Sequence, residues 1–370
     1  MEMIGDILEW YGRTIHPPLV LALCISGSLG HLLSIGTLSR MVNPTNTLLI
    51  SMSCCQLALC ANFLYSTFFK WASDELCSPL FFSKPMATTM HVSVSLSVFV
   101  HMSGVFHVVA LSIIRFCSLK RLTGVNSSLP WFTQTKCRVS LLIIYISVAI
   151  IGMPLYFTTE IVEVPEKAGC AQRFPQLKNV TSYELSFSNK NLQNLSFWLF
   201  NTCAKIIPSV ILCVMTLLIL YQLKKIRKIS ARFSTLERDQ QYQRTTKMIL
   251  MIMFMFICVE LPQGLLAVLS TFSTPFSSIY SALGDFNEMI TLLTACLIFF
   301  LFCAMNGRIR KAIMGAPCLV WIQELSKAAK KRKRLRSTGK DHLLGSCSVT
   351  QTPAIEKNGY SAMPPIISAE

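Results

Sequence analysis

Long apolar segments recur along the chain, separated by polar connections. Seven of them are long enough to cross a bilayer, since roughly 20 apolar residues span about 30 Å of hydrocarbon. The strands of a membrane barrel would be about 10 residues long and would alternate apolar with polar positions. The pattern therefore predicts an all-α integral membrane protein built as a seven-transmembrane helix bundle. The expected spans are about 18–39, 47–69, 86–113, 137–158, 195–222, 246–270 and 277–304.

Polar segments flank this transmembrane domain of residues 18–304. Residues 1–17 carry acids instead of a basic region, and no apolar stretch with a small-residue cleavage site follows them. We therefore expect the first span to insert as its own signal, with residues 1–17 as an extracellular N-terminus. Residues 305–370 are expected to form a cytoplasmic segment.

The C-terminal segment changes character along its length. Basic residues alternate with apolar ones around residues 308–314, which predicts a short amphipathic eighth helix lying on the inner leaflet. Cys318, just beyond, is a candidate palmitoylation site. A polybasic run follows at residues 327–336, and the composition from about residue 337 predicts a disordered tail.

Composition and charge agree with a membrane protein and give it an orientation. The chain is 52% hydrophobic and 14% charged, with a net charge of +16. The basic residues lie between and after apolar spans, so we expect lipid as their partner and no nucleic acid. With the N-terminus outside, 26 of the 34 Lys and Arg fall on cytoplasmic segments and 7 on outer ones, with Lys205 inside a span. This bias predicts an extracellular N-terminus and a cytoplasmic C-terminus in the plasma membrane.

The cysteines and sequons mark the outer connections. Most of the 15 cysteines lie in apolar runs, but Cys77 and Cys170 lie in outer loops and predict one disulfide, with two free thiols as the alternative. Asn179 opens an acceptor sequon in the same outer loop, and Asn194 opens a second one close to the membrane. Both are candidate glycosylation sites.

Charged and polar residues inside the spans are the main functional candidates. Glu260, Pro262 and Gln263 lie in the sixth span, where a carboxyl is costly and Pro262 predicts a kink. Lys205, one turn before Pro208 in the fifth span, is the expected partner of Glu260. The alternative is a kinked packing helix whose charges only neutralise one another.

Two further acids lie near the outer end of the seventh span. Asp285 and Glu288 are three residues apart and therefore share a helix face. Acids in the outer half of the bundle suit a cationic ligand such as the Arg of an Arg-Phe-amide peptide, because Arg forms bidentate pairs with carboxylates. The alternative is that both acids are simply solvated at the rim.

Enzyme and metal motifs are absent from the sequence. It contains no HExxH, GxSxG, P-loop or paired CxxC motif. His91, His101 and His107 lie along the third span at spacings that do not bring them to one helix face. We therefore expect no enzymatic activity, no catalytic residues, no cofactor and no metal site.

Several motifs resemble the rhodopsin-like G-protein-coupled receptors. Pro44-Thr45-Asn46 precedes the second span, Arg115 ends the third, and Pro208 and Pro262 occupy the fifth and sixth. The sixth span, RTTKMILMIMFMFICVELPQG, is similar to that of myosuppressin and FMRFamide-type neuropeptide receptors and of related nematode serpentine receptors. The resemblance covers about residues 18–315.

The resemblance implies roles for individual residues. His101 falls at a pocket-facing position, and the two prolines become hinges for an outward swing of the sixth helix that admits a heterotrimeric G protein. The basic residues bordering that cleft would be Arg115, Arg227, Arg244 and Lys247. The alternative is that most of these residues only satisfy the positive charge bias.

The sequence also departs from the family pattern. Gln56 replaces the sodium-binding Asp of the second helix, Ile114-Arg115-Phe116 replaces DRY, and Ile298 to Phe302 replaces NPxxY. His31 stands where the first helix usually has Asn. We therefore expect the polar network linking helices one, two and seven to be largely replaced by apolar groups.

The leading hypothesis is thus a receptor for an extracellular amidated peptide that signals through a G protein. A nematode-type chemosensory receptor for small molecules and a divergent receptor with weak or no coupling remain open. A transporter or channel is disfavoured because no internal repeat is visible.

Overall fold

The computed structural model describes residues 7–8, 10–40, 43–122, 131–230, 236–272, 280, 283–305 and 307. All of them belong to one compact unit, residues 1–313. The predicted amphipathic eighth helix, Cys318, the polybasic run and the tail lie outside the described residues.

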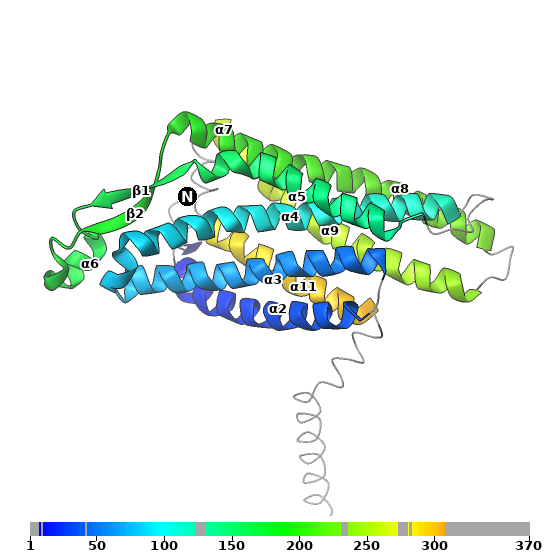
Figure 1. Cartoon of the computed structure of the whole chain (residues 1–370), viewed down its shortest axis with the longest axis horizontal. Coiled ribbons are helices and arrows are strands. Elements are labelled where there is room, and N and C mark those ends of the chain that lie inside the picture. Colours follow the sequence, from blue (N-terminus) through cyan, green and yellow to red (C-terminus); the bar gives the residue numbers. More distant parts are fainter. Residues whose placement is uncertain are drawn as a thin grey trace, which may run out of the picture. The chain divides into compact units, whose positions relative to one another are not determined.

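In the described part of the chain, seven helices are long and apolar enough to cross a membrane, which confirms the predicted fold class. Three of the seven combine an α-helix with a π-helical turn (Figure 1). The spans in chain order are η1 (Tyr11–Ile15) with α2 (His16–Leu38); α3 (Pro44–Lys70) with η2 (Trp71–Glu75); α4 (Lys84–Leu122); α5 (Gln134–Tyr156); α7 (Lys190–Phe200) with η5 (Asn201–Ile206) and α8 (Ile207–Ser230); α9 (Leu236–Phe272); and α11 (Gly284–Met305).

Local sequence signals explain where several helices begin. The Asn43 side chain accepts a hydrogen bond from the Thr45 amide at 3.0 Å, and Pro44 occupies the first turn of α3, where its missing N–H costs nothing. Asn189 caps α7 in the same way, through the Asn191 amide at 2.8 Å. The Pro44-Thr45-Asn46 motif is therefore a helix start.

Apolar side chains cover both the inside and the outside of the bundle. Leu111, Ile249 and Met253 are buried in the largest core cluster, whereas Ile150 and Leu217 are both 69% exposed. In water such exposed apolar faces would be unfavourable, but lipid tails cover them at no cost. The bundle is thus suited to a bilayer.

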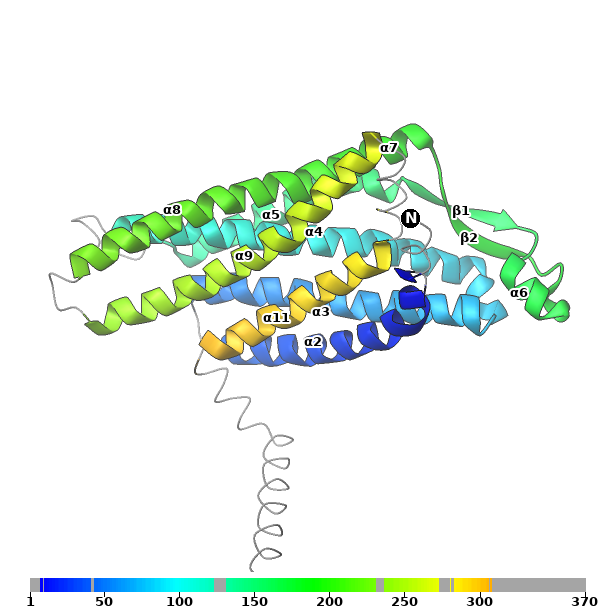
Figure 2. The same cartoon turned by 180° about the vertical axis from the view of Figure 1, so that it is seen from behind.

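A β-hairpin lies beyond one end of the bundle. Its strands, β1 (Thr159–Val164) and β2 (Ser182–Phe187), pair antiparallel with Ile161 opposite Leu185. Figures 1 and 2 both show the hairpin beside the start of α4, and the N-terminal ends of α2 and α11 lie at the same end of the bundle. We call this the hairpin end.

A disulfide and two ion pairs hold the connection between the hairpin strands in place. Cys77 and Cys170 are bonded across a sequence separation of 93 residues, which confirms the predicted bridge. Lys167 lies 3.1 Å from both Asp74 and Glu184. Burial disfavours the charged form of Lys167 and acts to lower its pKa. The hydrogen bonds and charges of these two acids outweigh this effect, so the pKa of Lys167 is raised. The short helix α6 (Ala168–Arg173) carries Cys170 between the strands.

Polar contacts between helices are present, so the expectation that apolar groups largely replace the polar network of helices one, two and seven is partly wrong. His31 Nε2 lies 3.1 Å from the Ala295 carbonyl oxygen and links α2 to α11. Ser51 on α3 contacts both the Tyr145 hydroxyl at 2.7 Å and His107 Nε2 at 2.8 Å. The contacts of Ser51 join α3, α4 and α5, a link that the family pattern did not predict.

Candidate functional site

Four of the predicted ligand-binding residues meet in the middle of the bundle. Glu260 on α9 lies 3.2 Å from His101 Nε2 on α4 and 3.5 Å from Lys205 Nζ on η5. Lys205 also donates a 2.6 Å hydrogen bond to Gln263 Oε1, one turn after Glu260. The expected contact between Lys205 and Glu260 is therefore present. We call these four residues the central cluster.

The backbone explains how Lys205 reaches this position. The π turn of η5 adds one residue to the helical repeat directly before Pro208, where the missing N–H would otherwise break the ladder. Gly264 lets α9 pack closely against η5, because a Cβ at this position would lie 3.0 Å from the Cβ of Lys205. Lys205 is thereby held against Glu260 and Gln263.

The central cluster is buried and almost charge-balanced. Glu260 is 2% exposed and Lys205 8% exposed. One carboxylate faces one ammonium, and the imidazole adds a positive charge only when it is protonated. Such an arrangement is favourable only when every member is paired, because buried charges lose their hydration. One group is left over, since the Gln263 Nε2 atom is buried without a hydrogen-bond partner.

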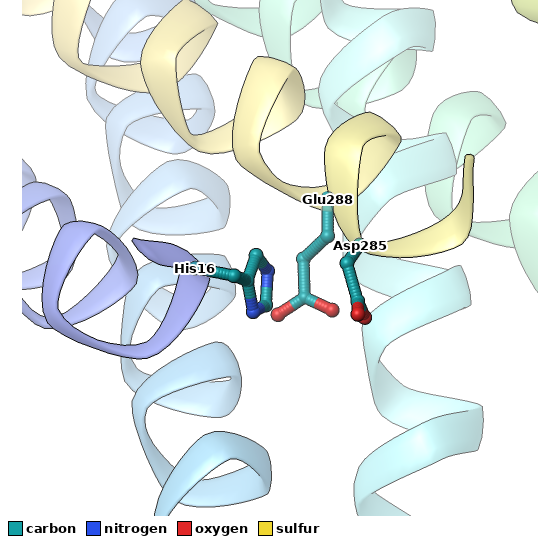
Figure 3. A group of neighbouring side chains, drawn as sticks. All are labelled: His16, Asp285 and Glu288. Carbon is teal, nitrogen blue, oxygen red and sulfur yellow. The ribbon is translucent and has the colours of Figure 1, made fainter. Parts of the chain in front are cut away.

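Asp285 and Glu288 form a second group, near the hairpin end, together with His16. The three side chains point toward one another in Figure 3, and their ligand atoms all lie within 4.8 Å of one another. His16 begins α2 and is 5% exposed, whereas both acids are partly exposed. We call these three residues the terminal cluster. Among the described residues, no hydrogen bond or ion pair joins it to the central cluster.

His16 is not among the residues predicted from the sequence. A signal was available, because the first and seventh spans run in the same direction and their N-terminal ends therefore meet at one end of the bundle. His16 begins α2, and Asp285 is the second residue of α11. Gly12 assists the contact, since a Cβ at this position would lie 2.6 Å from Asp285 Oδ2.

The predicted G-protein-facing residues are only partly described. Arg115 is buried near the end of α4 that lies opposite the hairpin end, and Lys247 is exposed on α9. The side chains of Arg227 and Arg244 lie outside the described part of the structure. Pro262 lies inside α9, which continues as a helix through it.

The two predicted sequons differ in their setting. Asn179 is exposed in the turn before β2 and has a positive φ of 65°. Asn194 lies within α7, and the hydroxyl of its sequon residue Ser196 is buried. An exposed turn is the better glycosylation acceptor because the modified segment must be accessible.

Comparison with known proteins identifies the class. The model of the family described as serpentine type 7TM GPCR chemoreceptor Srw matches residues 19–319. A relative named G-protein coupled receptor dmsr-1, from Caenorhabditis elegans, is 26% identical over 354 aligned residues, which cover 84% of this chain and 69% of the relative. The chain belongs to the Srw family of serpentine receptors. It is a multi-pass membrane protein and a G-protein-coupled receptor of the nematode serpentine type.

Proposed function

Because the chain is a serpentine receptor, we propose that it recognises an amidated, FMRFamide-like neuropeptide and signals through a heterotrimeric G protein. In this proposal the hairpin end is extracellular and the opposite end lies in the cytoplasm, with the receptor in the plasma membrane. The sequence supports this orientation, since 26 Lys and Arg fall on the expected cytoplasmic segments and 7 on the expected outer segments. The Cys77–Cys170 disulfide supports it as well, because thiols oxidise outside the cell.

One observation carries the choice of ligand. Gln263 Nε2 is a buried hydrogen-bond donor without a partner. The neighbouring Lys205 donates to the other end of the same amide, Gln263 Oε1, and pairs with Glu260. A ligand carbonyl placed there would accept this hydrogen bond and remove the cost of the unpaired donor. An amidated C-terminus brings a neutral carbonyl, whereas a free C-terminal carboxylate would bring a charge next to Glu260. The central cluster therefore favours an amidated peptide end.

The terminal cluster suits the Arg of such a peptide. Asp285 and Glu288 together carry up to two negative charges, and the His16 imidazole lies beside them. Glu260 already faces a cation, so an incoming guanidinium gains more from the two acids of the terminal cluster. Arg forms bidentate hydrogen bonds with carboxylates, which supplies both charge and geometry.

Binding at the hairpin end would bias a two-state arrangement of the helices. We propose that Pro208 and Pro262 act as its hinges, since each removes one hydrogen bond from its helix. The G-protein site at the opposite end would be formed by basic residues, namely Arg115, Arg227, Arg244 and Lys247.

Covalent modification completes the proposal. Asn179 is the first glycosylation site and Asn194 the second, and Cys318 carries a palmitoyl group that anchors the segment after α11. These sites affect folding and membrane attachment and are separate from ligand selection.

The test is a calcium or cAMP response in cells that express the full chain, screened against Arg-Phe-amide and related amidated peptides. Glu260→Gln and Glu288→Gln variants run beside the wild type at matched surface expression. We expect a saturable response that either variant weakens. Glu160→Gln, an exposed acid on β1, is the matched control and should leave the response unchanged.

A chemosensory receptor for small molecules is the second candidate, favoured by the match to a family of serpentine chemoreceptors. Silence across the peptide panel, followed by a response to a small organic molecule, would replace the peptide proposal with this one. A purified receptor that fails to promote guanine-nucleotide exchange with every ligand tested would instead indicate a divergent receptor without coupling.

A further inference from the structure

The terminal cluster has the composition of a metal site as well as of a ligand contact. It combines one imidazole with two carboxylates, contributed by two different helices, α2 and α11. Asp285 and Glu288 are three residues apart on α11, so both carboxylates leave the same helix face. His16 approaches this face from the start of α2 (Figure 3).

An independent observation points to a missing ligand. The His16 side chain is buried, with only 5% of the residue exposed, yet its Nε2 atom has no hydrogen-bond partner. A buried ring nitrogen without a partner is unfavourable unless something satisfies it. Figure 3 shows the ring turned toward the two carboxyl groups, so an atom placed among the three side chains would be reached by all of them.

The donor set selects the type of ion. Calcium and magnesium are bound by oxygen ligands, and Ca²⁺ needs six to eight of them. A neutral imidazole with carboxylates suits the borderline transition metals, above all Zn²⁺, which accepts nitrogen and oxygen ligands at about 2.0–2.2 Å. In a tetrahedral zinc site, atoms bound at these distances lie about 3.3–3.6 Å apart, so ligand atoms that are up to 4.8 Å apart must approach one another by about 1 Å when they bind an ion.

We propose that His16, Asp285 and Glu288 bind a zinc-class divalent cation, with water completing the coordination. This departs from the expectation of no metal site, which rested on the absence of metal-binding motifs and on the spacing of the histidines in the third span. The partial exposure of both acids gives an ion a way in. Lys70 lies within electrostatic range of His16 and Glu288 and is the cation with which the metal competes.

A bound ion would tie the start of α2 to the start of α11. Because its ligands are the two acids that the proposed function assigns to the peptide Arg, the ion would also exclude that Arg. This consequence rests on the proposed function, whereas the metal site itself does not. Zinc would then act as a competitive inhibitor of a cationic peptide and as a stabiliser of the receptor without peptide.

The experiment uses the full-length receptor, purified in detergent and stripped of metal by a chelator that is then removed. Zn²⁺ is added as the probe, and its binding is measured by calorimetry and by the thermal unfolding midpoint. At a free zinc concentration 100 times the dissociation constant we expect the midpoint to rise by about 3–6 °C. Mg²⁺ at the same concentration should produce no rise.

Variants assign the effect to the cluster. His16→Ala and Asp285→Asn should each weaken zinc binding at least 10-fold, while Glu160→Gln and His91→Gln, the matched carboxylate and imidazole controls, should bind as the wild type does. If His16→Ala does not fold, the Asp285→Asn variant provides the test. Asp285 is partly exposed and Asn has the same shape as Asp, so this variant is expected to fold. Co²⁺ absorption in the wild type provides a second readout, since nitrogen and oxygen ligation gives visible bands.

The proposal is overturned if the wild type shows neither heat of binding nor a shift with zinc. The proposal is also overturned if zinc raises the unfolding midpoint of the Asp285→Asn variant as much as it raises that of the wild type. These measurements contain no peptide, so failure of the zinc site leaves the peptide proposal intact. Zinc binding without any effect on a peptide response would keep the metal site and remove the assignment of the peptide Arg to these acids.

Discussion

The central and terminal clusters contain similar residue types but differ in charge and in environment. In the central cluster Glu260 is sealed between Lys205 and His101, within 3.5 Å of both. In the terminal cluster Asp285 and Glu288 face a single ring, His16, and remain partly open. A compensated buried cluster resists change, because each member depends on the others. An acidic and accessible cluster is free to bind a cation.

This difference indicates that the central cluster contributes most to the stability of the fold and that the terminal cluster is the more accessible to a ligand. The central cluster joins α4, η5 and α9 and is therefore expected to set their packing. The terminal cluster joins only the first and seventh spans at the hairpin end. Variants in the terminal cluster should consequently affect binding with little effect on folding, whereas variants in the central cluster should affect both folding and binding of the amidated peptide end.

The largest effect should come from Glu260→Leu. It leaves Lys205 buried without its anion, which costs about 3–5 kcal/mol, so we expect loss of folded receptor at the cell surface and a lower unfolding midpoint. Combining it with Lys205→Met should restore much of the stability, because an apolar pair replaces the ionic one. Equal stability of the single variant and the wild type would show that the pair contributes nothing.

Glu288→Gln should leave folding intact and reduce peptide potency. Removing one charged hydrogen-bond acceptor for the peptide Arg costs about 1.5–3 kcal/mol, so the half-maximal peptide concentration should rise about 10- to 100-fold. Concentration–response curves at matched surface expression measure this. An unchanged curve would mean that the Arg binds elsewhere.

The difference between the clusters also shows what the sequence can predict. Seven apolar segments, the Cys77–Cys170 bridge and the contact between Lys205 and Glu260 follow from length, charge bias and the cost of burying single charges. The π turn of η5 and the position of His16 do not, since they depend on how neighbouring helices pack. His31 illustrates the same limit, because its contact with the Ala295 carbonyl oxygen depends on how α2 and α11 pack.

Gly12→Ala should have a smaller effect. The added Cβ would lie 2.6 Å from Asp285 Oδ2 and push this carboxylate aside, while Ala suits the helical backbone better than Gly by up to about 1 kcal/mol. We expect normal folding with zinc affinity reduced about 3- to 10-fold, a loss of at most about 1.4 kcal/mol. Zinc calorimetry on the purified variant measures it, and an unchanged affinity would remove Asp285 from the metal site.

The smallest effect should come from Lys70→Gln. Lys70 is exposed, so its interaction with Glu288 is screened by solvent and contributes only a few tenths of a kcal/mol. Its removal should strengthen zinc binding about two-fold, in the direction opposite to the acid variants. Weaker zinc binding in this variant would contradict the electrostatic account of the terminal cluster.

The most direct test of the peptide proposal is guanine-nucleotide exchange by purified receptor and G protein with three forms of one Arg-Phe-amide peptide: amidated, free acid, and amidated with citrulline in place of Arg. We predict that the amidated form promotes exchange and the free acid does not. Citrulline should lower potency at least 10-fold in the wild type and by a clearly smaller factor in Glu288→Gln, because this variant has already lost one of the two acids that bind the Arg. Equal potency of the amidated and free-acid forms, or the same citrulline loss in both receptors, would contradict the account.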